Sequence, residues 1–247
     1  MVIRWEKEIN NFASGQVTAY DIQPCSDRGF IIVGAIQARS EENEAFIIKL
    51  NENGETGNRG WQRVISSTKN EYYTAVSELI EGFDTTYVAV GTVRVLNQTG
   101  ASIQIDRYSS RGELLNLKVF SQECENCRAN AAILIQENGE PKLIVAGTEI
   151  DNPALFRFGL YGNNVVFEGK SVLRNVQGNG LVTRRLSDGK FVLAGDISSK
   201  RSDSTHAFIA KFDIIRQDAT PAWTNRVVLY NEFLAMCIRM TMVILWR

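Results

Sequence analysis

The sequence predicts an all-β protein and, within that class, a β-propeller built from repeated four-stranded units. An apolar run that ends in glycine occurs four times, and a second apolar run that begins with alanine follows each copy. These alanines lie at 45, 101, 154 and 207, so successive units are 56, 53 and 53 residues apart (101−45, 154−101, 207−154). A period of this size is typical of solenoids, propellers and similar arrays, and strand-only repeats of about 40–50 residues favour propeller blades.

The first unit shows how each element is predicted. Segment 19–22 is followed by a turn at 26–29, by the apolar run 30–33, and by a second run at 45–50. Runs of about five residues rich in Ile, Val and Phe, and bounded by Gly, Asn and Asp, indicate strands rather than helices. Pairs such as Asn53-Gly54 are typical of hairpin turns, because both residues tolerate a positive φ.

The same order of segments recurs along one domain that spans 1–247. The predicted units are 5–60, 61–116, 117–169, 170–222 and a partial unit, 223–247, which makes about four full blades plus part of a fifth. Residues 236–247 lack the expected turn and glycine. Three interpretations stay open: a divergent last strand, a truncated or frame-shifted end, or a membrane-contacting tail. An open arc of blades exposes an unpaired strand edge, so we expect either a short closing blade or self-association through that edge.

Two sets of repeated residues are interpreted as structural. A glycine at the same place in every unit predicts a close approach of two backbones where strands converge. These glycines are Gly34, Gly91, Gly147 and Gly195. Tryptophan recurs at the opening of units, which predicts packing between blades, at Trp5, Trp61 and Trp223.

Composition disfavours several partners. Across 247 residues the formal net charge is −1 and no basic run occurs, which argues against nucleic acid and anionic membranes as partners. No apolar stretch is long enough to span a bilayer, so we predict no transmembrane segment. The charged start at 1–8 is not a signal peptide. Because the chain begins inside the repeat pattern, the compartment stays open.

The cysteines do not follow the repeat, so they do not form a repeated disulfide framework. Cys124 and Cys127 form a CxxC between two predicted strands. Two ordinary thiols are the favoured interpretation, and a local disulfide or metal or redox chemistry are the alternatives. A CxxC supplies only two of the four ligands of a structural zinc site, and His206 is the one histidine of the chain, so the sequence offers no second pair of ligands.

The sequence offers few residues from which a catalytic site could be built. His206 precedes a predicted strand and is interpreted as a loop residue, and no nucleophile-elbow, P-loop or zinc-binding motif occurs. A glycosidase needs two carboxylates across a cleft, and a propeller could bring together Asp21, Glu78 and Asp196 near one face. The acidic loop Glu41, Glu42 and Glu44 is interpreted as solvated, and the calcium-like turn 51–55 as a hairpin. We therefore predict no metal and no catalytic residue.

The unit "W.k.i … A.DI … D.GFIIVG … AFIIKLNENGE … W" resembles the repeat of bacterial and archaeal propeller-like proteins, whose units read like "GGyivaG … daWlvKLdsnGnvlW". The resemblance covers residues 5 to about 223. It implies a propeller, commonly with more blades than this chain holds, and an exported or surface location. The turn 51–57 with Trp61 also resembles the docking turn of quinoprotein propellers, but in one unit only. No cofactor is predicted.

These observations favour a non-enzymatic scaffold whose loops bind a protein or a glycan, because the loops differ between units while the strand cores persist. Exposed aromatic side chains would suit a glycan, and the candidates are Tyr72, Tyr73 and Tyr161. The alternative is a hydrolase or lyase acting on polysaccharide through carboxylates on one propeller face.

Overall fold

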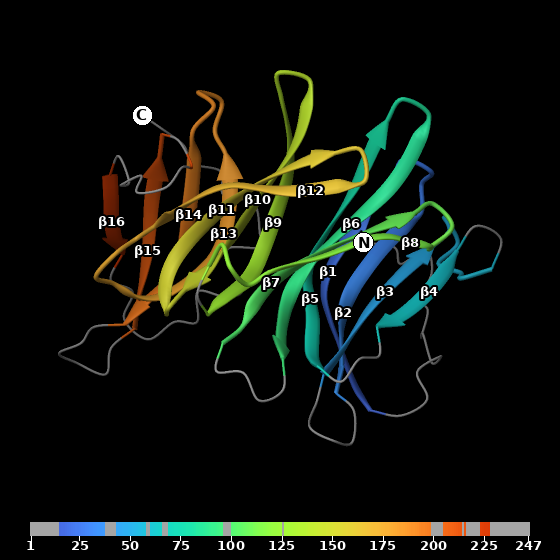
Figure 1. Cartoon of the computed structure of the whole chain (residues 1–247), viewed down its shortest axis with the longest axis horizontal. Helices are drawn as coiled ribbons and strands as arrows, with labels where there is room; N and C mark the ends of the chain where they lie inside the picture. Colours follow the sequence, from blue (N-terminus) through green and yellow to red (C-terminus); the bar gives the residue numbers. More distant parts are fainter. Residues whose placement is uncertain are drawn as a thin grey trace, which may run out of the picture.

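The computed structural model describes residues 15–37, 43–57, 60–65, 69–95, 100–124, 126–198, 205–213, 215 and 223–227. Within these residues the chain is all-β and forms four sheets of four strands each (Figure 1). Every sheet is an antiparallel meander, in which strand order follows chain order. The predicted fold class, an all-β propeller, is confirmed.

The first two sheets come from the N-terminal half of the chain. The first sheet contains β1 (Gln16–Pro24), β2 (Phe30–Gln37), β3 (Asn43–Leu50) and β4 (Trp61–Ile65). The second sheet contains β5 (Lys69–Glu81), β6 (Asp84–Val95), β7 (Ser102–Ser109) and β8 (Leu114–Phe120).

The other two sheets follow in the same pattern. The third sheet contains β9 (Cys127–Glu137), β10 (Glu140–Glu149), β11 (Asn152–Tyr161) and β12 (Asn164–Val172). The fourth sheet contains β13 (Gln177–Arg185), β14 (Phe191–Ser198), β15 (Thr205–Phe212) and β16 (Trp223–Val227).

The sheets are out of phase with the predicted repeat units. Trp61 was expected to open the second unit, but it begins β4, the last strand of the first sheet. Trp223–Val227 likewise forms β16 and completes the fourth sheet, where the sequence predicts the start of a fifth blade. The remainder of that partial unit, 228–247, and Trp5 lie outside the described residues.

The hairpin turns follow the predicted chemistry. Asn138 and Gly139 connect β9 to β10 with φ values of 53° and 82°, the positive values that a two-residue turn between twisted strands requires. Asn51 closes the turn after β3, because its Oδ1 accepts hydrogen bonds from the backbone N–H groups of Asn53 and Glu55, both at 2.9 Å. The calcium-like segment is therefore a hairpin turn, as expected.

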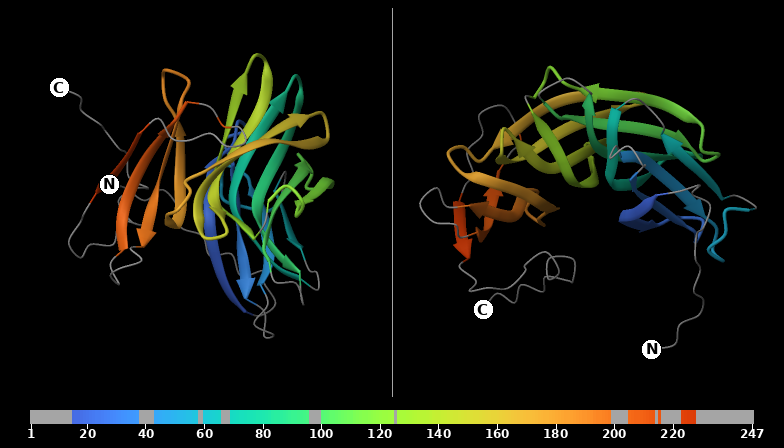
Figure 2. Two further views of the ribbon diagram at one scale, coloured as in Figure 1. Left: turned by 60° about the vertical axis from the view of Figure 1, so that its left-hand side comes forward. Right: turned by 90° about the horizontal axis from the view of Figure 1, so that it is seen from below.

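The four sheets stand side by side in an arc, with the first strand of each sheet, β1, β5, β9 or β13, toward its concave side (Figure 2, right). From the second sheet on, each first strand packs against the sheet before it. The core lies between sheets: one apolar cluster joins the first and second, another the second and third, and another the third and fourth. Strand β10 therefore buries both faces, and β2 does so because a further apolar cluster of β2 and β3 residues covers its other side; both strands read as continuous apolar runs.

None of the described residues forms a helix with the length and hydropathy that a membrane span requires.

Candidate functional site

Each first strand carries one extra residue, a β-bulge, at the same place. The pairing with the second strand shifts between Ala19 and Asp21, between Tyr73 and Ala75, and between Gly180 and Val182. In β9 the partners jump from Ala131 to Ala129. The bulged residues are therefore Tyr20, Thr74, Asn130 and Leu181. Bulges bend a strand and re-aim side chains, and they are frequent beside functional sites.

The repeated glycines lie opposite these bulges. A Cβ on Gly91 would stand 2.0 Å from the carbonyl oxygen of Tyr72, and one on Gly147 would stand 1.9 Å from that of Arg128. Gly34 and Gly195 meet the first strands of their sheets in the same way. Real Cβ atoms do not make contacts this short, so only glycine fits at these four positions. The close backbone approach that the sequence predicts therefore occurs where the bulged first strand passes next to the second strand.

Side chains at or beside the bulges connect one sheet to the next. Thr74 Oγ1 donates to the carbonyl oxygen of Ala129 at 3.2 Å, which joins the second sheet to the third. Asn130 Nδ2 donates to the carbonyl oxygen of Gly180 at 3.0 Å, which joins the third sheet to the fourth. These bonds join β5 to β9 and β9 to β13, and Asp21 joins β1 to β5 by accepting from Val76 N–H. The surface formed by the four first strands is called the axial face.

An aromatic pair and a carboxylate lie on the axial face where the first and second sheets meet. The rings of Tyr20 and Tyr72 have centroids 6.2 Å apart and are tilted by 51°, and Tyr20 is 37% exposed. Asp21 Oδ2 accepts a hydrogen bond from the backbone N–H of Val76 at 3.0 Å. Gln23 Nε2 also donates to Asp21, at 3.1 Å. Aromatic rings with adjacent polar groups suit a ligand that is both apolar and hydroxylated.

The three carboxylates singled out in the sequence lie on three different sheets. Asp21 lies on β1, and Asp196 lies on β14 in the fourth sheet, where its Oδ1 accepts from Asn179 Nδ2 at 2.8 Å. Glu78 lies toward the other end of β5, beside the turn that contains Ser26. Asp21 thus lies on the first strand of its sheet and Asp196 on the second strand, paired with Asn179 of β13, whereas Glu78 lies at the hairpin end of the first and second sheets.

Two of the aromatic candidates do not sit on exposed loops as expected. Tyr73 is on β5 and is 1% exposed, and its hydroxyl donates to Asp106 and lies 2.8 Å from that of Tyr108. It cannot stack on a ligand, because the strand turns it into the core between the first and second sheets. Tyr72 lies on the same strand and points the other way, as alternate strand residues do.

Tyr161 lies at the end of β11 and is 39% exposed. Its hydroxyl donates to Glu168 and accepts from Lys142 Nζ. Arg157 also binds Glu168, at 2.7 Å. Burial would raise the pKa of Glu168, but the hydrogen bonds from Arg157, Lys142 and Tyr161 outweigh it and lower the pKa to about 2. Tyr161 is therefore part of an ion-pair network that stabilises the third sheet.

The remaining candidates fall on structural positions. Trp61 packs against the second sheet, as expected for a residue between blades, with its ring 5.9 Å from that of Tyr87. His206 was expected in a loop, but it lies inside β15, because the strand begins one residue earlier, at Thr205. The predicted loop 41–42 is outside the described residues, and Glu44 belongs to β3.

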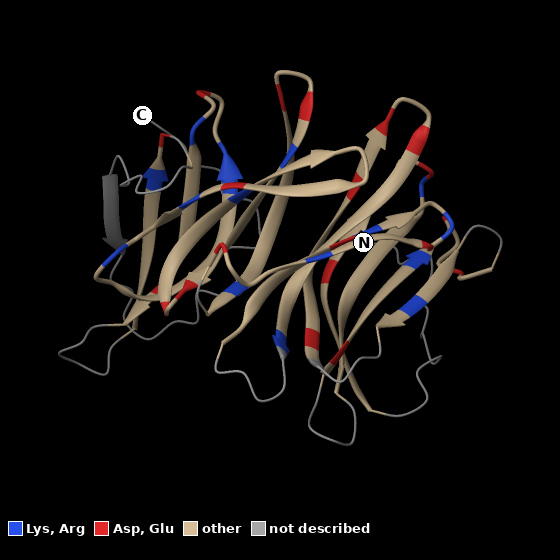
Figure 3. Cartoon of the chain, in the orientation of Figure 1, with Lys and Arg blue, Asp and Glu red and all other residues tan. Residues whose placement is uncertain are grey.

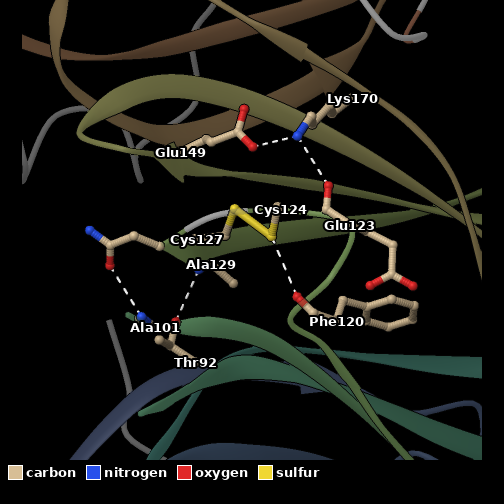
Figure 4. The surroundings of a disulfide bond; sticks show 10 residues. Thr92, Ala101, Phe120, Glu123, Cys124, Cys127, Ala129, Glu149 and Lys170 are labelled. Carbon is tan, nitrogen blue, oxygen red and sulfur yellow. Dashed lines mark hydrogen bonds and ion pairs between the residues drawn. A yellow bond between two sulfur atoms is a disulfide. The ribbon is translucent and has the colours of Figure 1, made fainter. Parts of the chain in front are cut away.

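The two cysteines of the CxxC are joined as a disulfide (Figure 4), whereas ordinary thiols were favoured from the sequence. The surrounding segment connects the second and third sheets. Cys127 N–H donates to the carbonyl oxygen of Ala101 at 2.8 Å, and Asn126 Oδ1 accepts from Ala101 N–H at 3.1 Å. Ala129 N–H, just before the bulge, donates to Thr92 Oγ1 at 3.0 Å. The disulfide therefore braces the start of β9 at the axial face.

In the part of the chain that the structure describes, no three His, Cys, Asp or Glu side chains are placed to hold a metal ion.

Neither a protein-family model nor a curated protein sequence matches the chain. Solved structures do match its fold. A GH93 α-L-arabinofuranosidase of Fusarium graminearum, in complex with arabinobiose, superposes with a TM-score of 0.52 at 12% identity, over 86% of this chain and 67% of the other. The same arabinofuranosidase with an iminosugar inhibitor gives 0.51 at 11% identity, over 85% and 66%. This chain spans about two thirds of their length, and the likeness shows the fold alone.

Proposed function

We propose that this propeller binds a glycan on its axial face and hydrolyses it there. The observation that carries the proposal is the pair Tyr20 and Tyr72 beside Asp21, on the strands that a bulge turns toward the concave side of the arc. Tyrosine rings offer the apolar surface on which sugar rings pack, and carboxylates accept hydrogen bonds from their hydroxyls. The similarity in fold to glycosidases is consistent with this ligand class.

Glycoside hydrolysis by the common mechanism needs two carboxyl groups, one to protonate the leaving oxygen and one to act as base or nucleophile. Asp21 and Asp196 are the two acids that we assign to these tasks. Each is oriented by hydrogen bonds from protein groups, Asp21 by Val76 N–H and Asp196 by Asn179. Donors of this kind hold a carboxylate in place without neutralising it.

The disulfide supports an exported location for such an enzyme. Disulfides persist in oxidising compartments and are rare in the cytosol, where thiols are kept reduced. A polysaccharide substrate is met in the same compartments.

The test is turnover on 4-nitrophenyl glycosides, including the α-L-arabinofuranoside, and on a panel of polysaccharides. We expect Asp21→Asn and Asp196→Asn each to lower kcat by at least about a hundredfold, as loss of a general acid or base does. The substitutions Tyr20→Ala and Tyr72→Ala should weaken binding with less effect on kcat. Asp84→Asn, on an exposed hairpin end, is the matched control.

A non-enzymatic scaffold is the second candidate, and one observation favours it. The hydrogen bond from Val76 N–H joins Asp21 to β5 of the second sheet, a contact that also serves to connect two blades. If the wild-type protein binds a glycan, loses binding on Tyr72→Ala, and turns over none of the panel, the axial face is a binding surface. If it binds no glycan at all, both proposals fail, and a protein ligand becomes the better explanation.

A further inference from the structure

A hollow lies at the hairpin end of the first and second sheets, where the β1–β2, β5–β6 and β7–β8 turns meet. It has a volume of about 470 Å³, within the range of small-molecule sites. Its walls are the β1–β2 turn, the start of β4, the end of β5, the start of β6 and the β7–β8 turn. The lining residues used below are Ser26, Asp27, Trp61, Glu78, Tyr87 and Arg111. Carboxylates mark this hairpin end of the molecule (Figure 3).

The aromatic wall of the hollow is rigid. Trp61 Nε1 donates to the carbonyl oxygen of Ser110 at 3.0 Å, and its ring centroid lies 5.9 Å from that of Tyr87 and 6.0 Å from that of Tyr108. A Cβ on Gly112 would meet the indole at 2.5 Å, so the turn after β7 packs closely on the ring. This wall therefore needs no rearrangement to receive a ligand.

The two carboxylates of the hollow differ in their partners. Asp27 is neutralised by Lys49, whose Nζ lies 2.7 and 2.9 Å from its two oxygens and is 1% exposed. Burial would raise the pKa of Asp27, but the hydrogen bonds from Lys49 and Gly29 lower it overall. Glu78 instead accepts hydrogen bonds from Ser26, through N–H at 2.7 Å and Oγ at 3.1 Å. Among the described residues, no cationic group lies within ion-pair distance of Glu78.

We propose that this hollow binds an organic ammonium of sugar size, such as a hexosamine, with Glu78 as its counter-ion. The neutral donors of Ser26 fix the carboxylate and leave its charge unbalanced, which is the condition in which a charge-assisted hydrogen bond contributes most. Trp61 and Tyr87 line the hollow as buried side chains, 8% and 2% exposed, and form an apolar floor against the carbon skeleton of such a ligand. Arg111 stands on the exposed turn at the mouth, where solvent screens its charge. The proposal does not depend on hydrolysis at the axial face.

Glucosamine and glucose form a matched pair of probes, since one ammonium replaces one hydroxyl. In an NMR titration of the ¹⁵N-labelled chain, we expect glucosamine to shift the amide signals of Ser26, Thr85 and Arg111. We expect it to bind about tenfold more tightly than glucose, the usual effect of a hydrogen bond to a charged group. Glu78→Gln should remove that preference, because the amide keeps the hydrogen bond from Ser26 but carries no charge. Glu113→Gln, on the exposed β7–β8 turn, should retain it.

Equal affinity for the two sugars in the wild-type protein would overturn the proposal without any variant. So would a preference for glucosamine that survives Glu78→Gln, or binding of neither sugar at their highest soluble concentrations. Shifts confined to Tyr20 and Tyr72 would assign the sugar to the axial face instead. Asp21→Asn should leave the titration unchanged, which separates failure here from failure of the proposed hydrolysis.

Discussion

Asp106 is the buried group whose substitution tests the electrostatics of this fold most sharply. It is fully buried between the first and second sheets, where Tyr73 and Gln104 donate hydrogen bonds to its Oδ2. Burial, reinforced by the nearby Glu71, raises its pKa from 3.8 to about 6, even though the hydrogen bonds from Tyr73 and Gln104 lower it. Between pH 3.8 and about 6 the native state therefore holds a proton on Asp106 that the unfolded chain releases.

The sign of the pH dependence follows from this difference. Below pH 3.8 Asp106 is protonated in both states, and between 3.8 and about 6 the native state binds the proton more tightly. The free energy of unfolding falls as pH rises through this window, because the native state binds more protons than the unfolded state. Two pKa units correspond to about 3 kcal/mol, which is the full penalty above pH 6.

We therefore expect Asp106→Asn to stabilise the protein at pH 8. The amide oxygen still accepts from Tyr73 and Gln104, while the buried charge is gone. Urea unfolding at pH 8 should give a free energy up to about 3 kcal/mol higher than wild type. For a chain of this size that corresponds to a rise in Tm of about 6–12 °C. Near pH 4 the two proteins should differ much less, because the wild-type carboxyl is then neutral.

Asp84→Asn removes a charge from an exposed position and serves as the control, with little change expected at either pH. The reasoning is refuted if Asp106→Asn is destabilising at pH 8, or if it changes stability by the same amount at pH 4 and pH 8. Either result would mean that the native state pairs the Asp106 charge well enough to offset its burial.

Two further predictions concern the axial face. Gly91→Ala should lower the free energy of unfolding by at least about 2 kcal/mol, since its Cβ would meet a backbone oxygen at 2.0 Å that no side-chain rotation relieves. Gly57→Ala has open space and is the control, and equal effects of the two in urea unfolding would contradict the argument. Replacing Cys124 and Cys127 together by serine should cost about 2 kcal/mol, the chain-entropy value for so short a loop. Calorimetry with and without a phosphine reductant checks this, and a wild-type protein insensitive to reductant would speak against a stabilising disulfide.

The strands were predictable, but their grouping into sheets was not. Short apolar runs with Asn-Gly and Asp-Gly turns specify strands and hairpins locally. A period in sequence, however, has no intrinsic starting point. Trp61 recurs with the unit that follows it, yet its strand pairs with β3 of the unit before. Strand pairing depends on backbone hydrogen bonds, which the periodicity of side chains does not reveal. Only the structure therefore shows where one sheet ends and the next begins.

The axial face was predictable in part for a related reason. The repeated glycines signalled a close backbone approach, and the bulges that cause it lie across from them. The bulge position holds a different residue type in each unit, so no repeated residue in the sequence identifies it. These residues are Tyr20, Thr74, Asn130 and Leu181. The pair Tyr72 and Tyr73 shows the other limit, since neighbouring strand residues face opposite ways and only the register decides which is buried.

The two candidate sites both involve β5 but lie toward opposite ends of this strand. Tyr72 and Glu78 are six positions apart on β5, or about 20 Å of extended strand. Sites this far apart with no shared partner should act independently, so the losses caused by Tyr72→Ala and Glu78→Gln should add. We expect the double variant to lose glycan binding at the axial face and glucosamine preference in the hollow by the same factors as the single variants. A coupling above about 0.5 kcal/mol in this cycle would show instead that the rigid boundary between the first two sheets transmits the state of one site to the other.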